Sequence, residues 1–141
     1  MSNPGPASVA TIHPSNLATN QALRLIAYYP SVNLNAVEDS IAPILDTAGN
    51  VSAKSVIVAN ASASLTTAQL AVYTGAGATG TAVKSAYALS GNTSSAKVVE
   101  TAVTSTDLIT GNQLYIRCTT PQGSAATADV YVYGYDLSYF S

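Results

Sequence analysis

The sequence predicts an all-β protein: an antiparallel two-sheet β-sandwich of the jelly-roll type, preceded by an extended N-terminal arm. From about residue 21 onward, apolar residues recur at every second position, which is the period of half-buried strands and not of helices. Turn-forming residues separate these segments at intervals of about 8–20 residues, as in sandwiches and jelly rolls. A chain of 141 residues has the length of one domain. We therefore predict an arm over residues 1–20 and a single β-sandwich domain over residues 21–141.

The arm differs from the rest of the chain in composition. Its three prolines disfavour both helix and central strand, because proline lacks a backbone N–H and restricts the residue before it. Val9, Ile12 and Leu17 supply apolar side chains between these prolines. We interpret the arm either as a frayed terminus or as an interface segment that becomes ordered on a neighbouring subunit through these three residues.

Seven segments show the strand pattern, within an expected total of seven or eight strands. In the first of them, the odd-numbered residues from Leu23 to Tyr29 are expected to share one face. The last two are the clearest because they alternate most regularly. The segments are residues 23–29, 54–60, 69–74, 82–89, 97–103, 113–119 and 128–135.

Helix is expected in less than about a tenth of the chain, because the helical period is scarce. The short candidates are residues 35–40, which Pro43 would end, and residues 64–68. We interpret the span 30–52, which contains the first candidate, as a long loop with local turns.

One glycine-rich run has the spacing of a nucleotide-binding loop. Residues 75–80 read Gly-Ala-Gly-Ala-Thr-Gly, but phosphate binding requires such a run between a strand and a helix. Here the alternating residues Val83, Ser85, Tyr87 and Leu89 follow, which indicates a second strand. The run is therefore predicted to connect the two strands of a hairpin.

Composition excludes several classes of function. The net charge of −2, from 7 acidic and 5 basic residues, cannot neutralise several phosphates, so nucleic acid is not an expected partner. One His, one Cys and no Trp disfavour zinc sites, His-based triads and Trp-lined sugar platforms. The chain has no apolar run of membrane-spanning length, and its first residues lack the pattern of a secretory signal. We expect a structural protein made in the cytoplasm, with no enzymatic activity, no cofactor and no membrane partner.

The acidic residues of the 38–46 segment are the first candidates for chemistry. Glu38 and Asp39 are adjacent, and adjacent residues on an extended or looping chain point apart, so they are interpreted as solvated loop charges. A cation site formed with Asp46 and backbone carbonyls is the alternative, although the regular ligand spacing is missing.

The last two predicted strands indicate the core. Leu114, Ile116 and Cys118 share one face, and Val130 and Val132 share one face of the final strand. Cys118 is therefore predicted to be a buried small apolar residue and not a nucleophile.

The final strand also carries a stripe of tyrosines. Tyr131, Tyr133 and Tyr135 lie on the face opposite the valines, outward or between subunits. Tyr115 and Tyr73 would join this surface if their strands pair alongside. Tyrosine buries a large area at low entropic cost, so the stripe is predicted to be a contact surface. The alternative is that both faces are half-buried within one domain.

Three segments resemble a known kind of protein. Residues 60–75 (NASASLTTAQLAVYTG), 108–123 (LITGNQLYIRCTTPQG) and 125–133 (AATADVYVY) are similar to a recurrent pattern in small virion proteins of tailed bacteriophages. These are capsid decoration, or cement, proteins, some of which are jelly rolls of about this length. The resemblance covers roughly residues 50–135.

The resemblance implies a role without enzymatic activity. The protein would bind the outside of the assembled head, bridge neighbouring subunits of the major capsid protein, and form a dimer or trimer. It would reside on the capsid surface of the virion, after assembly in the host cytoplasm. Two alternatives are another phage structural component, in the neck, tail or head fibre, and a carbohydrate- or surface-binding β-sandwich module.

Overall fold

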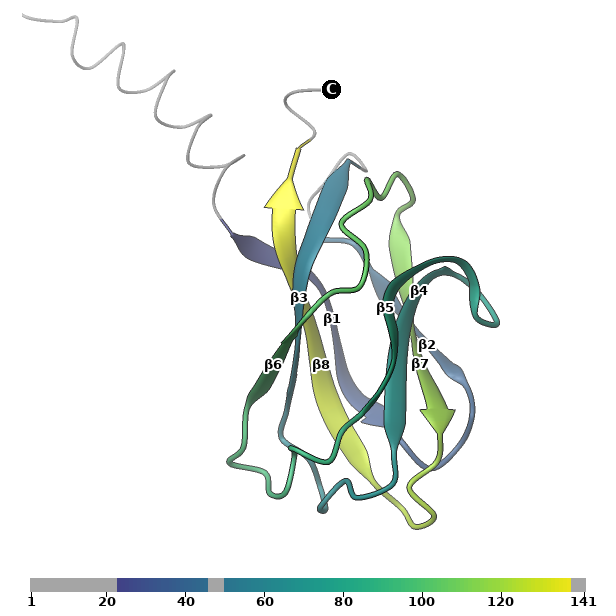
Figure 1. Cartoon of the computed structure of the whole chain (residues 1–141), viewed down its shortest axis with the longest axis vertical. Helices are drawn as coiled ribbons and strands as arrows, with labels where there is room; N and C mark the ends of the chain where they lie inside the picture. The colour runs from purple at the N-terminus through teal and green to yellow at the C-terminus, as the bar shows by residue number, and fades with distance from the viewer. Residues whose placement is uncertain (1–22, 46–49, 138–141) are drawn as a thin grey trace, which may run out of the picture.

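The computed structural model describes residues 23–45 and 50–137. Within these ranges every regular element is a β-strand, and the strands form two antiparallel sheets of four strands that face each other (Figure 1). The predicted antiparallel β-sandwich is therefore confirmed. The arm over residues 1–20, with Val9, Ile12 and Leu17, lies outside the described residues, as does Asp46.

The two sheets draw on alternating parts of the chain. The first sheet has the order β1-β8-β3-β6, and the second has the order β2-β7-β4-β5. Among the described strands, only β4 and β5 are consecutive neighbours in one sheet, and every other connection passes from one sheet to the other. A jelly roll also has eight strands in two sheets, and the jelly-roll part of the expectation stays a prediction. The strands are β1 (Arg24–Asn33), β2 (Asp39–Pro43), β3 (Val51–Ala59), β4 (Gln69–Gly75), β5 (Thr79–Ala88), β6 (Val99–Ala102), β7 (Gln113–Thr120) and β8 (Thr127–Asp136).

The core lies between the sheets and follows the predicted alternation. Leu114, Ile116 and Cys118 of β7 and Val130 and Val132 of β8 are all fully buried. These residues belong to one continuous cluster of apolar side chains. The next residue along each strand points to the other side of its sheet, so both sheets also have an outer face.

The interpretation of residues 30–52 as a long loop is wrong. This span contains the end of β1, all of β2 and the beginning of β3, and residues 35–40 and 64–68 are not helical. β2 gives a weak signal because its inward-facing residues, Ser40 and Ala42, are small. It also ends in Pro43, which an edge strand tolerates because no neighbour requires its N–H.

The glycine-rich run forms the predicted hairpin between β4 and β5. Gly77 and Gly80 have φ angles of 66° and 72°, in the left-handed region that glycine enters at low cost. A strand and not a helix follows, so the run lacks the structure of a nucleotide-binding loop.

Hydrogen bonds also join the two sheets along their edges. Ala27 of β1 forms a bridge with Ile44, and the Leu45 N–H donates to the Ile26 carbonyl oxygen at 2.7 Å. On the opposite side, the Thr104 N–H donates to the Val83 carbonyl oxygen at 2.8 Å. These bonds cover part of the backbone edges on which another strand would pair. The outer faces of the sheets therefore remain as the most extended surfaces of the described residues.

Candidate interaction surfaces

The predicted tyrosine stripe lies on the outer face of the first sheet. Tyr131, Tyr133 and Tyr135 alternate along β8 with buried residues and are themselves half-buried. The Tyr28 ring of β1 stacks on Tyr131, with ring centroids 4.7 Å apart and an angle of 19° between the planes. Stacked aromatic pairs contribute about 0.5–1.5 kcal/mol beyond their buried area, so this pair holds the middle of the stripe in place.

Residues of the neighbouring strands extend this surface sideways. Tyr131 of β8 lies between two partners in the sheet, with Tyr28 of β1 on one side and Ile57 of β3 on the other. Ile57 in turn lies opposite Glu100 of β6. Val98, just before β6, is 65% exposed, which is high for a large apolar side chain. We name this set the first tyrosine surface: Tyr28, Ile57, Val98, Tyr131, Tyr133 and Tyr135.

A shallow pocket opens on the first tyrosine surface. Its volume is about 360 Å³. Apart from Asn60, its lining is aliphatic or aromatic, and the Asn60 amide already donates a hydrogen bond of 2.8 Å to Asp129. Such a lining favours an apolar side chain as occupant over a polar small molecule. The lining residues are Ile57, Ala59, Asn60, Val98, Tyr131 and Tyr133.

Tyr115 and Tyr73 do not join this surface, because the condition for it, that their strands pair alongside β8, is not met. They lie on β7 and β4, which pair with each other in the second sheet, and Tyr73 lies directly opposite Tyr115. Ile41 of β2 lies opposite Tyr115 on the other side and is 50% exposed. Ile41, Tyr73 and Tyr115 thus form a second tyrosine surface on the outer face of the second sheet. The two surfaces face away from each other on opposite sides of the sandwich.

Glu38 and Asp39 are both predicted to be solvated loop charges, and Asp39 differs from that prediction. Asp39 begins β2, and its carboxylate accepts hydrogen bonds of 2.9 Å from the Arg117 guanidinium and 2.8 Å from the Gly77 N–H. Its side chain is 17% exposed, so interpreting Asp39 as a solvated loop charge is wrong. Glu38 is exposed and accepts a hydrogen bond of 2.9 Å from the Asn33 side-chain amide. Asp39 therefore ties the β4–β5 hairpin to β2 and β7.

Two opposing effects act on the pKa of Asp39. Burial raises it, while the Gly77 N–H and the Arg117 guanidinium lower it, and the net result is a lowered pKa. The carboxylate therefore stabilises the fold above the unfolded-state pKa of about 3.9. That contribution is lost as the pH falls through the folded-state pKa.

We expect Asp39→Asn to lower the free energy of unfolding by about 1–3 kcal/mol at neutral pH, because two hydrogen bonds to a charged group are lost. The difference from the wild type should be smaller at about pH 2.5 than at neutral pH, because the contribution of the carboxylate falls as the pH drops below the unfolded-state pKa of about 3.9 and toward the lowered folded-state pKa. Urea unfolding of the variant and the wild type, at neutral pH and at about pH 2.5, measures this difference in the free energy of unfolding. Glu38→Gln, which changes the adjacent exposed carboxylate, is the control and should have little effect. An equal loss for Asp39→Asn at both pH values would contradict the role of the ionised carboxylate.

The described residues show no cluster of three or more side chains that could hold a metal ion. Glu38 and Asp39 bond to different partners, and the partner of Asp39 is itself a cation. The structure therefore does not bring these two carboxylates together around one point.

Cys118 lies in the core, as predicted. It is fully buried, and burial is the main reason that the pKa of its thiol is raised. The thiol donates to the Thr120 carbonyl oxygen at 3.4 Å. A buried thiol with a raised pKa is a poor nucleophile, which agrees with its predicted role in packing.

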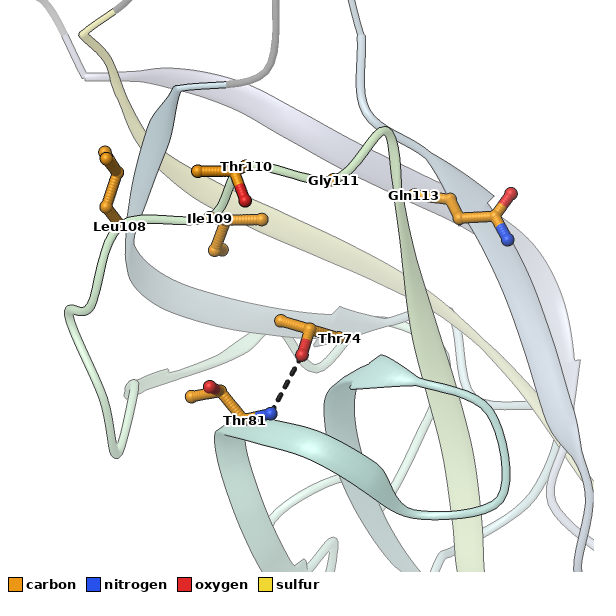
Figure 2. Close-up of a pocket in the computed structure, with 7 residues that line it drawn as sticks. All are labelled: Thr74, Thr81, Leu108, Ile109, Thr110, Gly111 and Gln113. Carbon is orange, nitrogen blue, oxygen red and sulfur yellow. Dashed lines mark hydrogen bonds between the residues drawn. The ribbon is translucent and has the colours of Figure 1, made fainter.

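A second pocket, of about 280 Å³, was not predicted from the sequence. Figure 2 shows Thr74 and Thr81 on one side of it, joined by a hydrogen bond of 2.8 Å from the Thr81 N–H to the Thr74 hydroxyl oxygen. The segment before β7 forms the other side. The pocket offers hydroxyl and amide groups but no titratable side chain, and threonine is too common in this chain to mark it. The lining residues are Thr74, Thr81, Leu108, Ile109, Thr110, Gly111 and Gln113.

No protein-family model matches the chain, and no curated protein matches its sequence. The resemblance to capsid decoration proteins stays a prediction. In the part of the chain that the structure describes, no helix is long and apolar enough to cross a membrane.

Proposed function

We propose that this chain is a structural protein of a phage virion, which binds the outside of the assembled capsid and bridges neighbouring subunits of the major capsid protein. The observation that supports the proposal is the presence of two tyrosine-rich outer faces on opposite sides of one small sandwich. A bridging protein requires at least two separate contact surfaces. The resemblance of residues 60–75, 108–123 and 125–133 to decoration proteins supports the same role.

The composition determines what kind of adhesion is available. With 7 acidic and 5 basic residues, the chain can form few ion pairs, and exposed pairs contribute only about 0–1 kcal/mol each. Apolar area contributes about 25 cal/mol per Å², so a contact needs several hundred Å² before it outweighs the entropy of association. Exposed apolar side chains on both outer faces, such as Val98 and Ile41, can contribute to such a contact. Many copies on a lattice would then be held by avidity.

Co-sedimentation with capsids tests the proposal. Shells are assembled from the major capsid protein encoded in the same genome, and the same protein is also prepared as unassembled subunits. We expect the chain to sediment with the shells, to saturate at a fixed ratio, and to bind the unassembled subunits weakly, because avidity requires the lattice. Leu108→Ala, which changes an exposed residue outside both tyrosine surfaces, should bind as the wild type does.

Absence of binding to the shells would overturn the proposal. Labelling of intact virions with an antibody to this chain then separates the remaining alternatives. A signal at the neck, tail or head fibre would assign the chain to that component. Binding of a monomer to an immobilised glycan would assign it to the carbohydrate-binding modules.

A further inference from the structure

We infer that the first tyrosine surface is the contact between two copies of this chain, related by a two-fold axis. The second tyrosine surface of each copy then remains free, so the dimer carries two separate contact surfaces, and their use in bridging capsid subunits rests on the proposed function. The dimer itself does not depend on that function. Three features of the outer face of the first sheet carry the inference: its apolar centre, the placement of its charges, and its area.

The apolar centre of this face suits a second copy. Tyr131 and Tyr133 are neighbours on the outer face of β8, one opposite Ile57 and the other opposite Ser55 of β3. Tyr131 and Ile57 thus form one row across the strands, and Tyr133 and Ser55 form the next row. A two-fold axis that runs across the strands, between these two rows, places Tyr131 of each copy against Tyr133 of the other. In such a contact the same patch of both copies forms the interface, so the tyrosine stripe of one sheet is sufficient for both sides of the dimer contact. The apolar pocket beside the stripe offers space for a side chain of the second copy.

The charges beside the stripe are complementary under the same axis. Lys54 precedes Ser55 on β3, and Glu100 of β6 lies opposite Ile57, so the two charges lie beside the two different rows. Both residues are exposed, and neither forms an ion pair within the described ranges 23–45 and 50–137. The axis that exchanges the rows brings Lys54 of each copy near Glu100 of the other. Complementary charges of this kind fix the register of a contact more than its strength.

The area of the face is sufficient for a dimer. β1, β3 and β8 have nine or ten residues and β6 has four, so three strands roughly 33 Å long and one short edge strand cover roughly 500–550 Å² when flat. Side-chain relief increases the accessible area beyond this value. A standard stable interface buries about 800 Å² on each partner. The outer face is thus of the right size for one partner sheet.

The inference is tested by the molar mass of the full-length chain in solution. Light scattering measures this mass without capsid protein, at about 100 μM and in a dilution series. We expect a dimer. Lys54→Glu and Glu100→Lys should each raise its dissociation constant about tenfold, because like charges then face each other, and the double variant should restore it. Both positions are exposed, so these variants keep the fold. Tyr133→Ala should dissociate the dimer, with circular dichroism used to check that it remains folded.

Variants of the opposite face provide the matched control. Ile41→Ala should leave the dissociation constant unchanged, because Ile41 lies on the second tyrosine surface. The inference would be overturned by a chain that is a monomer at every concentration or a trimer. It would also be overturned by a dimer that Ile41→Ala dissociates and Tyr133→Ala does not. A third contradicting result is a failure of the double variant to restore the affinity lost in the two charge reversals. A monomer that still binds shells would overturn this inference alone. A dimer that does not bind shells would overturn the proposed function alone.

Discussion

Gly134→Ala is expected to lower the free energy of unfolding by about 3 kcal/mol or more, because the added methyl group has no room. Gly134 lies on the buried side of β8, where that strand pairs with β3. A Cβ at this position would overlap the Ser52 carbonyl oxygen and lie 2.8 Å from the Ala53 Cα. Both atoms belong to the β3 backbone, which cannot withdraw without breaking its pairing with β8.

Urea unfolding followed by circular dichroism measures the effect of Gly134→Ala. Gly111→Ala is the matched control, because a Cβ at Gly111 meets no atom within 4 Å. The control should change stability by no more than about 0.5 kcal/mol. Similar small losses for the two variants would show that β3 and β8 are not packed as closely as described.

Ile116→Ala is expected to cost about 2–5 kcal/mol, since it removes buried methylene groups and leaves a cavity. Ile116 is fully buried on β7, between β2 and β4. Ile41→Ala makes the same chemical change on the adjacent strand, at a side chain that is 50% exposed. That control should cost less than about 1 kcal/mol. A loss below about 1 kcal/mol for Ile116→Ala would mean that the other face of β7 is inside.

The strands that could be predicted are those whose inward-facing residues are large. β7 and β8 place leucine, isoleucine and valine at every second position, and their faces are as expected. β2 places Ser40 and Ala42 inward, which gives no apolar period to detect. The first predicted strand is present as β1, but the prediction of which residues share its face is wrong. A register shift between Leu25 and Ala27 turns the chain, so the odd-numbered residues do not share one face.

The candidate surfaces could be predicted only in part. Alternation along β8 places its tyrosines on the outer face, because that inference needs only one strand. The separation of Tyr115 from them depends on which strands pair, and strand pairing is decided by contacts far apart in sequence. The ion pair of Asp39 with Arg117 spans 78 residues and has no local signal for the same reason.

Binding of the full-length chain to assembled shells, titrated with salt, tests most directly whether adhesion uses the tyrosine surfaces. Between about 50 mM and about 500 mM salt, the Debye length falls from about 14 Å to about 4 Å, so contacts between exposed charges are strongly screened. Apolar contacts are not weakened by this screening. We predict that the affinity for shells changes less than about threefold over this range, since charges at the rim contribute little. A loss of more than about tenfold would contradict the account and would place the contact on charged groups such as Glu38.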